Sequence, residues 1–267
     1  MNYLQNKRIV LTGASSGIGR EMTKLLLSKY GATVIGIGRN EEKLRSLKAE
    51  LGDKFSYYAM DVSVKENWQN FAQKLKMEGV GIDLLINNAG VFPQFERAED
   101  ITSEQIQAVM SVNFYASVYG IERLLDLLGK EGGIVNICSS GALCTVVGTS
   151  AYSASKSAMK GYTEALMLEE SERYVGLIFP GTTATELFRN DENTKNSALD
   201  LVAMPSSKMA KKILKKIARK RKRAVVGWDA KLMNLTAKLV PVWGLRLICA
   251  VMRASKSKVF DRVFRKK

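Results

Sequence analysis

Histidine is absent from the 267-residue sequence, and cysteine and proline are scarce, with three and four residues. Without an imidazole the chain cannot carry a Ser-His-Asp triad, a histidine-relayed dehydrogenation or the usual zinc hydrolase site. The cysteines, Cys138, Cys144 and Cys249, form no CxxC pair, so neither a disulfide scaffold nor a thiolate metal site is expected. Proton transfer must use Tyr, Lys, Asp, Glu or Cys, and no metal is predicted.

Long hydrophobic runs and an export signal are also missing. The N-terminal stretch "MNYLQNKRIVLTG" has a short apolar run that leads into a glycine turn, unlike a signal peptide. The most apolar part of the C-terminal region, residues 239–252, has only 14 residues and includes Pro241 and Arg246, so it is too short and too polar to span a bilayer. We therefore expect a reducing, cytoplasmic location.

Charge is distributed unevenly along the chain. Residues 1–207 hold 21 Lys and Arg against 24 Asp and Glu, a net charge of −3, whereas residues 208–267 hold 20 against 2, a net charge of +18. The basic segment lacks a nucleic-acid reader motif and interleaved stacking aromatics, so no nucleic-acid partner is predicted. We expect a catalytic domain over residues 1–228 and a basic amphipathic helical extension over residues 229–267. Residues 208–267 either contact an anionic membrane peripherally or pack over the substrate pocket or a second subunit.

Short β-branched runs alternate with longer helical patterns in the first part of the chain. The runs cover residues 8–13, 32–38, 55–62, 83–90, 133–140, 175–181 and 224–227. Such near-continuous apolar runs suit strands that are buried on both faces, and the intervening segments are long enough for crossover helices, with helices expected over residues 17–28 and about 102–128. The pattern predicts an α/β fold, a doubly wound Rossmann-type parallel sheet of about seven strands in one domain.

A glycine-rich turn, "TGASSGIG" at residues 12–19, follows the first predicted strand. Gly13 would allow a tight turn, Gly17 would let the backbone approach a pyrophosphate, and Gly19 would let the helix pack closely on the strand. The spacing is G-x3-G-x-G instead of the usual G-x-G-x-x-G. Its place between a first strand and a first helix predicts a nucleotide site.

Six further motifs follow the glycine turn in order: MDV (60–62), NNAG (87–90), VN (112–113), NICSS (136–140), YSASK (152–156) and PG (180–181). Over roughly residues 5–227 the chain resembles the short-chain dehydrogenase/reductase family. The resemblance implies a Rossmann fold, a nicotinamide cofactor, and oxidoreductase activity on a small-molecule alcohol or ketone. It also implies a homo-oligomer, a dimer or a tetramer.

The resemblance places the proton-transfer groups on Asn113, Ser139, Tyr152 and Lys156. Tyr152 would exchange a proton with the substrate oxygen, which Ser139 would hydrogen-bond. Lys156 would hold the nicotinamide ribose, and Asn113 would hold a water that links Lys156 to solvent. Ser140 is the rival for the serine role, but Ser139 lies thirteen positions before Tyr152, as is usual in the family.

The residue types of "YSASK" fit that chemistry. Tyr152 and Lys156 lie four apart and would project from one face of a helix. The ammonium group would favour the phenolate and lower the pKa of Tyr152, and the small residues between them would let nicotinamide and substrate approach. On the spacing alone, both could be surface residues of an ordinary helix that Thr149 or Ser150 caps.

Cofactor preference depends on the end of the second predicted strand. NAD-preferring relatives usually carry an acid there, whereas Arg39 in this chain could face a 2′-phosphate, so NADP(H) is preferred over NAD(H). Alternatively, Arg39 is a solvated residue at a helix start. The family pattern places the cofactor contacts on Gly13, Ser15, Ser16, Gly17, Ile18, Gly19, Arg39, Asp61, Val62, Asn88, Ala89, Gly90, Tyr152, Lys156, Thr183 and Thr185.

The substrate side carries a weaker pattern. Residues 183–204 form either a mobile lid or a plain surface loop. Apolar residues on loops that should face the nicotinamide indicate a steroid-like or acyl-chain substrate, or else are ordinary loop anchors: Phe92, Leu143, Val146, Val147, Leu187 and Phe188. The sequence therefore predicts an oxidoreductase that interconverts a secondary alcohol and a ketone, with a non-catalytic nucleotide-sensing or scaffold protein as the alternative.

Overall fold

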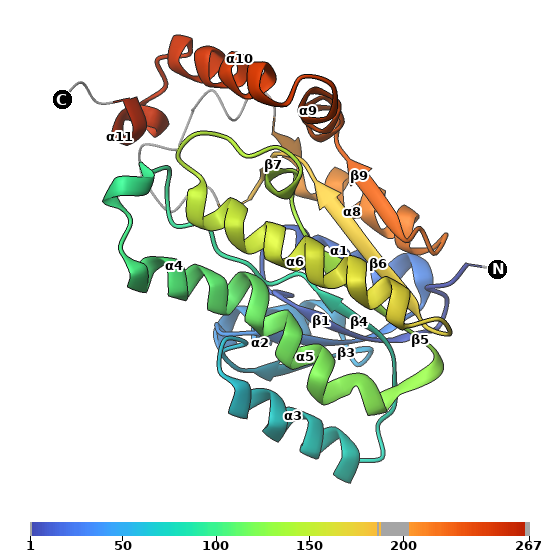
Figure 1. Ribbon diagram of the computed structural model, residues 1–267. Helices are drawn as coiled ribbons and strands as arrows, with labels where there is room; N and C mark the ends of the chain where they lie inside the picture. The colour runs from blue at the N-terminus through green and yellow to red at the C-terminus, as the bar shows by residue number, and fades with distance from the viewer. Residues whose placement is uncertain (1, 186, 188–202, 265–267) are drawn as a thin grey trace.

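The computed structural model describes residues 2–185, 187 and 203–264. Its main sheet has seven strands, all paired in parallel, in the order β3-β2-β1-β4-β5-β6-β9 (Figure 1). The predicted doubly wound parallel sheet is confirmed. The strands are β1 (Arg8–Thr12), β2 (Thr33–Gly38), β3 (Phe55–Ala59), β4 (Ile82–Asn87), β5 (Leu128–Ile137), β6 (Tyr174–Pro180) and β9 (Arg223–Val226).

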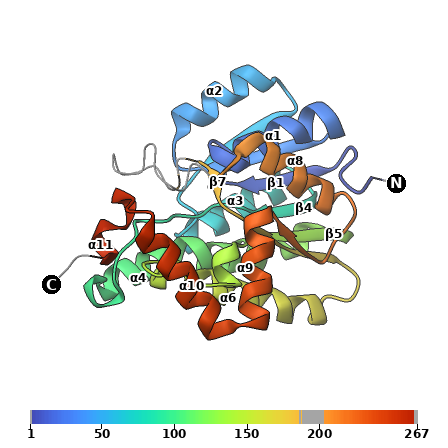
Figure 2. The same cartoon turned by 90° about the horizontal axis from the view of Figure 1, so that it is seen from above.

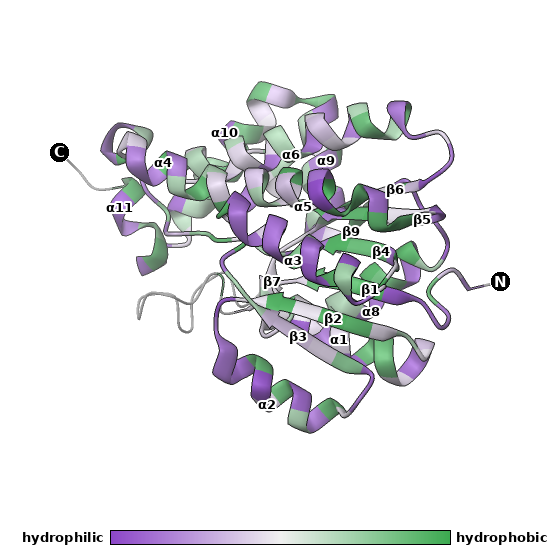
Figure 3. Ribbon diagram, turned by 90° about the horizontal axis from the view of Figure 1, so that it is seen from below, coloured by the Kyte–Doolittle hydropathy of each residue, from purple (hydrophilic) through white to green (hydrophobic). Residues whose placement is uncertain are grey.

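Helices cover both faces of the sheet (Figures 1 and 2). One face packs against α1 (Gly17–Tyr30), α2 (Glu41–Leu51) and α8 (Ser206–Ile217). The other packs against α3 (Lys65–Met77), α5 (Ala116–Leu124) and α6 (Ser150–Glu169). Figure 3 shows hydrophobic strands between helices with mixed surfaces. Neighbouring strand residues face opposite cores, since Ile9 and Leu11 join the first core and Val10 joins the second.

Three strands, β3, β4 and β5, end three residues earlier than the sequence predicts, at Ala59, Asn87 and Ile137. The motif residues that follow them turn away from the ladder and form loops at the carboxyl edge of the sheet. In open α/β sheets this edge is where ligands bind. Most of residues 183–204 lie outside the described residues, apart from β7 (Thr183–Ala184), which pairs with β8 (Met204–Pro205).

The long helix predicted over residues 102–128 is interrupted. Its pieces are α4 (Ser103–Met110), a π-helical turn (Ser111–Tyr115), α5 and a 3-10 turn (Leu125–Leu127). The π-helical turn contains Asn113, whose side chain bonds to the backbone of Val91 at 2.7 and 2.9 Å. The bulge is therefore held by contact with the loop after β4, which a helical period does not reveal.

The C-terminal extension forms α9 (Trp228–Leu239), α10 (Pro241–Ala254), a 3-10 turn (Lys258–Phe260) and α11 (Asp261–Phe264). In Figure 1, α9 and α10 lie across the top of the molecule. The helix α9 is fastened to the loop after β6, because the Asp229 carboxylate accepts a 2.6 Å hydrogen bond from the Thr182 N–H. Within the described part of the chain, no helix has the length and apolar content needed to cross a membrane.

Candidate active site

Two adjoining cavities open at the carboxyl edge of the sheet, with free volumes of about 310 and 220 Å³. Every residue that the sequence predicts for cofactor binding lines one or both of them. The larger cavity is lined by Gly13, Ser16, Gly17, Ile18, Gly19, Arg39, Asn88, Ala89, Gly90, Tyr152, Lys156, Thr183 and Thr185. The smaller shares several of these and adds Ser15, Asp61 and Val62.

The glycine turn needs its glycines. Gly13 and Gly17 have φ angles of +67° and +49°, a region that residues with a Cβ rarely adopt. A Cβ on Gly19 would overlap the carbonyl oxygen of Gly13. This close approach lets α1 begin directly at the cavity, where its free N–H groups and positive dipole end favour a phosphate.

Asn88 fixes the position of the loop after β4. Its side-chain Nδ2 donates to the Thr12 carbonyl at 2.9 Å, and the backbone N–H groups of Asn88 and Ala89 both donate to Thr12 Oγ1 at 2.9 Å. The ends of β1 and β4 are thereby joined beneath the cavities. The side chain of Asn88 therefore both holds the loop after β4 in place and lines the larger cavity.

Asn113 lies behind Gly90, outside both cavities. Its Oδ1 accepts from the Val91 N–H at 2.7 Å, while its Nδ2 donates to the Val91 carbonyl at 2.9 Å and to Ser155 Oγ at 3.0 Å. These bonds join the π-helical turn to the β4 loop and to α6. The side chain of Asn113 therefore holds Gly90 against Lys156, whose Nζ lies 3.5 Å from the point where a Gly90 Cβ would stand.

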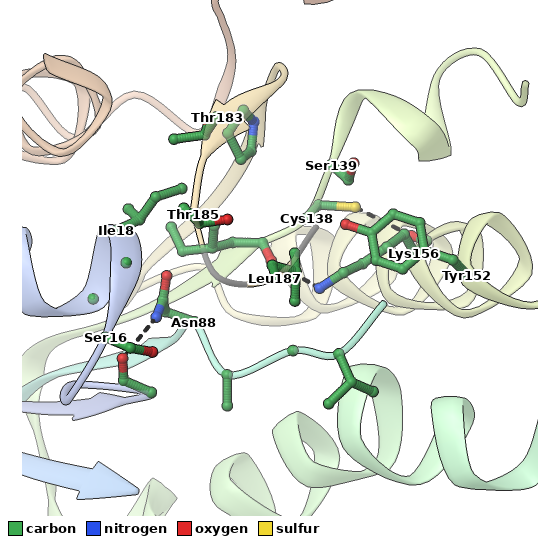
Figure 4. A pocket seen from close by; sticks show the side chains of 18 of the residues that line it. Ser16, Ile18, Asn88, Cys138, Ser139, Tyr152, Lys156, Thr183, Thr185 and Leu187 are labelled. Carbon is green, nitrogen blue, oxygen red and sulfur yellow. Dashed lines mark hydrogen bonds between the residues drawn. The ribbon is translucent and has the colours of Figure 1, made fainter. Parts of the chain in front are cut away.

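Ser139, Tyr152 and Lys156 meet in the larger cavity (Figure 4). Helix α6 begins at Ser150, two residues before Tyr152, and presents Tyr152 and Lys156 to one side. Ser139 lies close enough to Tyr152 to influence the pKa of the tyrosine, and its Oγ accepts a 3.1 Å hydrogen bond from the Gly141 N–H. Ser140 lines the same cavity but is buried in a 3-10 turn. The Lys156 Nζ lies 6.0 Å from the centre of the Tyr152 ring and 3.4 Å from the Ile137 carbonyl.

The pKa of Tyr152 departs from the expectation drawn from the sequence. Burial raises the pKa of Tyr152 to about 12, and the hydrogen bond with Ser139 opposes this rise only in part. Burial also lowers the pKa of Lys156. Both side chains are below 10% exposed, so the low-dielectric surroundings disfavour phenolate and ammonium alike. The expected lowering of the tyrosine pKa by Lys156 is wrong for this structure.

The smaller cavity combines a carboxylate with cations. Asp61 Oδ1 accepts from the Ser63 N–H at 2.9 Å and from Ser63 Oγ at 2.7 Å. Burial opposes ionisation of Asp61, but these bonds and the charge of Arg39 outweigh it and lower its pKa. Sequence reasoning missed Lys43, which lies in the first turn of α2 and lines the same cavity as Arg39. The sequence could have indicated Lys43 by its position, three residues after Asn40, which caps the N-terminus of α2.

The larger cavity carries a polar group that no described residue hydrogen-bonds. Thr183 and Thr185 line the larger cavity, and the buried Thr185 Oγ1 has no hydrogen-bond partner among the described residues. A carboxamide could supply that partner. With the glycine cradle and the cations near Asp61, the residues present fit a nicotinamide dinucleotide. In the described ranges no three His, Cys, Asp or Glu side chains gather to hold a metal ion.

An apolar cluster surrounds Tyr152. Phe92, Val146, Val147 and Leu187, which the sequence predicts to face the nicotinamide, belong to it, whereas Leu143 packs in a separate cluster with Cys138; Phe188 lies outside the described residues. Sequence reasoning missed the members that come from the C-terminal extension, Val259, Phe260 and Val263. The sequence could have indicated these residues by the apolar pair Val259–Phe260, which is repeated four residues later as Val263–Phe264 within a basic segment.

Cys138 lies in the NICSS motif but was not among the predicted site residues. Its thiol donates a 3.1 Å hydrogen bond to the backbone carbonyl of Lys156. Burial raises the pKa of the Cys138 thiol to about 11. It is therefore a neutral packing group that ties β5 to α6, and not a nucleophile.

A family model, described as short chain dehydrogenase, matches residues 7–196. The chain belongs to the short-chain dehydrogenase family. The match covers β1 to β6 and all the motif loops, and as a member of this family the protein is an oxidoreductase whose fold binds a nicotinamide cofactor.

Individual relatives of this short-chain dehydrogenase include enzymes named for lipid and steroid substrates. The 3-ketodihydrosphingosine reductase of Bos taurus is 29% identical over 257 residues, which cover 90% of this chain and 77% of the relative. The 3beta-hydroxysteroid dehydrogenase 2 of Eggerthella lenta is 30% identical over 192 residues, covering 69% and 74%. Among solved structures, a serine dehydrogenase in complex with NADP+ superposes with a TM-score of 0.74 at 26% identity, covering 82% of this chain and 94% of that chain.

Proposed function

We propose that this short-chain dehydrogenase is an NADP(H)-dependent enzyme that interconverts a secondary alcohol and a ketone on an apolar substrate. The observation that carries the proposal is the meeting of Ser139, Tyr152 and Lys156 in the cavity that also contains the glycine turn. A proton-transfer group and a dinucleotide cradle thus share one free volume. That is the arrangement that coupled hydride and proton transfer needs.

The chain's own residues would handle the proton. In reduction, the Tyr152 hydroxyl donates its proton to the ketone oxygen while Ser139 hydrogen-bonds the same oxygen and steadies the charge that develops there. Lys156 binds the nicotinamide ribose, and Asn113 holds the loop and helix that position Lys156. The bound dinucleotide would supply or accept the hydride at the substrate carbon. Phe92 packs edge-on against the Tyr152 ring at 5.2 Å and fixes its orientation.

The preference for NADP(H) rests on Arg39 and Lys43. Both line the cavity that Asp61 and Val62 complete, so two cations surround the place where the adenosine ribose would lie. A 2′-phosphate is a dianion that such a pair would bind through charge-assisted hydrogen bonds. The NADP+ bound in the related serine dehydrogenase supports this choice.

Replacing Arg39 tests the cofactor assignment. In Arg39→Asp the cation is lost and an acceptor for ribose hydroxyls is gained, so affinity for NADPH should fall by about tenfold to a hundredfold while affinity for NADH rises. Fluorescence titration with both cofactors measures the change. Arg45→Asp on the outer face of α2, where Arg45 pairs with Glu41 at 3.1 Å, is the matched control. A wild-type protein that binds NADH more tightly than NADPH would contradict this assignment.

The pH dependence should show the raised pKa of Tyr152. With that pKa at about 12, the tyrosine is protonated throughout the neutral range, so the acid needed for reduction is present and the base needed for oxidation is scarce. Reduction should be nearly flat from about pH 6 to about pH 9, while alcohol oxidation should rise roughly tenfold per pH unit. The measurement is kcat/KM in both directions. An oxidation rate that is already flat near neutral pH would place the functional pKa far lower.

The apolar substrate class follows from the cluster around Tyr152. Phe92, Val146 and Leu187 belong to it from the body, and Phe260 joins it from the extension. The names of the two relatives point the same way, one to a long-chain ketone and the other to a steroid. We therefore propose a steroid-like or acyl-chain-bearing substrate.

A substrate screen is the direct test. Purified protein is assayed with steroid ketones, long-chain ketones and short water-soluble ketones, with NADPH or NADH, by absorbance of the reduced nicotinamide. Turnover of an apolar ketone with NADPH is the expected result. Tight NADPH binding without turnover of any ketone or alcohol would instead favour a nucleotide-sensing protein on the same fold.

Two associations accompany this proposal. Members of the family act on small molecules and are often oligomeric, so we propose a homo-oligomer, whose mass can be measured by sedimentation. We also propose a cytoplasmic setting. Peripheral contact with anionic membrane through residues 208–267 is the second. Within that segment, α8 buries Met209, Ile213 and Ile217 in the core, so only its lysine-rich face is free to take part.

A further inference from the structure

Exposed apolar side chains concentrate on the C-terminal helices. Among the described residues, ten of the fifteen large apolar side chains that are exposed lie between Trp228 and Val251. Trp243 and Leu239 are 73% and 70% exposed. We name this set the apolar face; it consists of Trp228, Leu232, Leu235, Leu239, Val240, Val242, Trp243, Leu245, Leu247 and Val251. Exposed apolar side chains gathered on two neighbouring helices normally mark a contact with a partner or a membrane.

The two helices present this surface by their spacing. On α9, Trp228, Leu232, Leu235 and Leu239 are four, three and four residues apart, which places them on one side of the helix. On α10, Trp243, Leu247 and Val251 repeat every four residues. The two helices approach each other closely at Gly244, which is buried and where a Cβ would collide with Thr236 of α9. The residues of the apolar face lie outside this contact and are exposed.

Cations border the apolar face. Lys231, Lys238, Arg246 and Arg253 are all exposed, and Arg246 lies over the Trp243 ring at 5.4 Å. The one acid within α9 and α10 is Asp229, whose carboxylate is occupied by the Thr182 N–H. Two copies joined through this surface would bring like charges together, whereas anionic lipid headgroups would complement them. Trp and basic residues beside exposed aliphatic side chains are typical of helices that lie in the membrane interface.

The chain beyond α10 returns to the catalytic site. Met252 of α10 packs on the cluster around Tyr152, and the Phe260 ring lies 5.0 Å from that of Phe95, edge to face. Val263 meets the turn at Gly148. One continuous segment thus carries the apolar face at its start and packs at its end in the cluster that contains Tyr152 (Figures 1 and 2).

We propose that α9 and α10 dock on an anionic lipid bilayer with the apolar face inserted in the interface and the flanking cations on the headgroups. Docking holds the apolar side of the catalytic cleft close to the bilayer, from which the substrate enters. The docking gives the membrane contact proposed above its helices and side chains, and the route of the substrate rests on the proposed function.

Vesicle flotation of the full chain tests the docking. The wild type should float with phosphatidylcholine–phosphatidylserine vesicles, and less with pure phosphatidylcholine vesicles or at high salt. In Trp243→Glu/Leu247→Glu two inserted side chains are lost, so binding should weaken by about a hundredfold or more. The matched control is Met77→Glu/Leu168→Glu, which charges two side chains that are 81% and 86% exposed elsewhere. It should bind as the wild type does.

Tryptophan fluorescence gives a second readout. Trp68 is fully buried, so quenching by lipids with brominated acyl chains reports on Trp228 and Trp243. We expect brominated lipids to quench the wild-type fluorescence. In Trp243→Phe the quenching should be smaller, while the protein should still float with the vesicles. A wild type that does not float, or equal flotation of the two double variants, would overturn the proposal. So would sedimentation showing that Trp243→Glu/Leu247→Glu converts a dimer into monomers, because the face would then be a subunit contact.

Turnover separates the docking from the substrate route. With a long-chain ketone held in anionic vesicles, Trp243→Glu/Leu247→Glu should turn over at least about tenfold more slowly than the wild type. With the same ketone dispersed in detergent the two should be equal. Equal rates in vesicles would overturn the substrate route. No turnover by the wild type in either medium would overturn the proposed function, and the flotation result would still decide the docking.

Discussion

Tyr152→Phe should lower turnover by roughly two to four orders of magnitude, the range that general acid–base catalysis contributes. The substitution removes the transferable proton but keeps the ring, which remains packed at 5.2 Å from Phe92. Binding of NADPH should therefore change little. Steady-state kinetics with a fluorescence titration of the cofactor measures both quantities.

The matched control is Tyr162→Phe on the same helix. Tyr162 packs edge-on against Phe114 at 5.9 Å, away from the cavities, so this variant should keep wild-type turnover. If Tyr152→Phe also retained nearly full turnover, the proton would have to come from another group, and the assignment would fail.

Lys156→Met should lower turnover by about a hundredfold or more and also weaken NADPH binding by about tenfold. The ammonium group lies in the cavity beside Gly90 and Tyr152, where it would contact the ribose and transmit the proton. Methionine matches the length of the lysine stem, and loss of a buried charge removes a desolvation penalty. Thermal unfolding should therefore show a fold at least as stable as the wild type.

Lys160→Met, one helical turn later, is the control for this variant. Lys160 pairs with Glu164 at 2.8 Å on a partly exposed surface, and such pairs contribute at most about 1 kcal/mol. Its kinetics and cofactor affinity should match the wild type. The combined loss of turnover and NADPH affinity distinguishes Lys156 from Tyr152, where only turnover should fall. Unchanged NADPH affinity in Lys156→Met would remove the proposed ribose contact.

The fold and the loops that line the cleft could be predicted because their signals are local. Apolar runs buried on both faces identify parallel strands, and glycines at 13, 17 and 19 are required by the backbone of a single turn. Parallel strands all end at one edge of the sheet, so motifs that follow different strands must converge there. The sixteen predicted cofactor residues line the two cavities for this reason.

The break in the helix around Asn113 could not be predicted in the same way. The helical period continues through residues 102–128, and the π-helical turn is held by bonds to Val91, 22 residues earlier. A contact of this kind depends on how the β4 loop is placed against the helix. Sequence spacing carries no information on that placement.

The sequence by itself determined the order of the strands and helices, the glycine turn and the identity of the catalytic-type side chains, since each depends on near neighbours in the chain. Only the tertiary structure decided the ionisation of Tyr152 and the place of the C-terminal extension. The pKa of Tyr152 depends on the atoms that exclude water from it, which come from segments as distant as Phe92 and Phe260. The extension could have faced either way as an amphipathic helix, and packing against Phe95 and Gly148 brought its end onto the cluster that contains Tyr152 while leaving the apolar face outside.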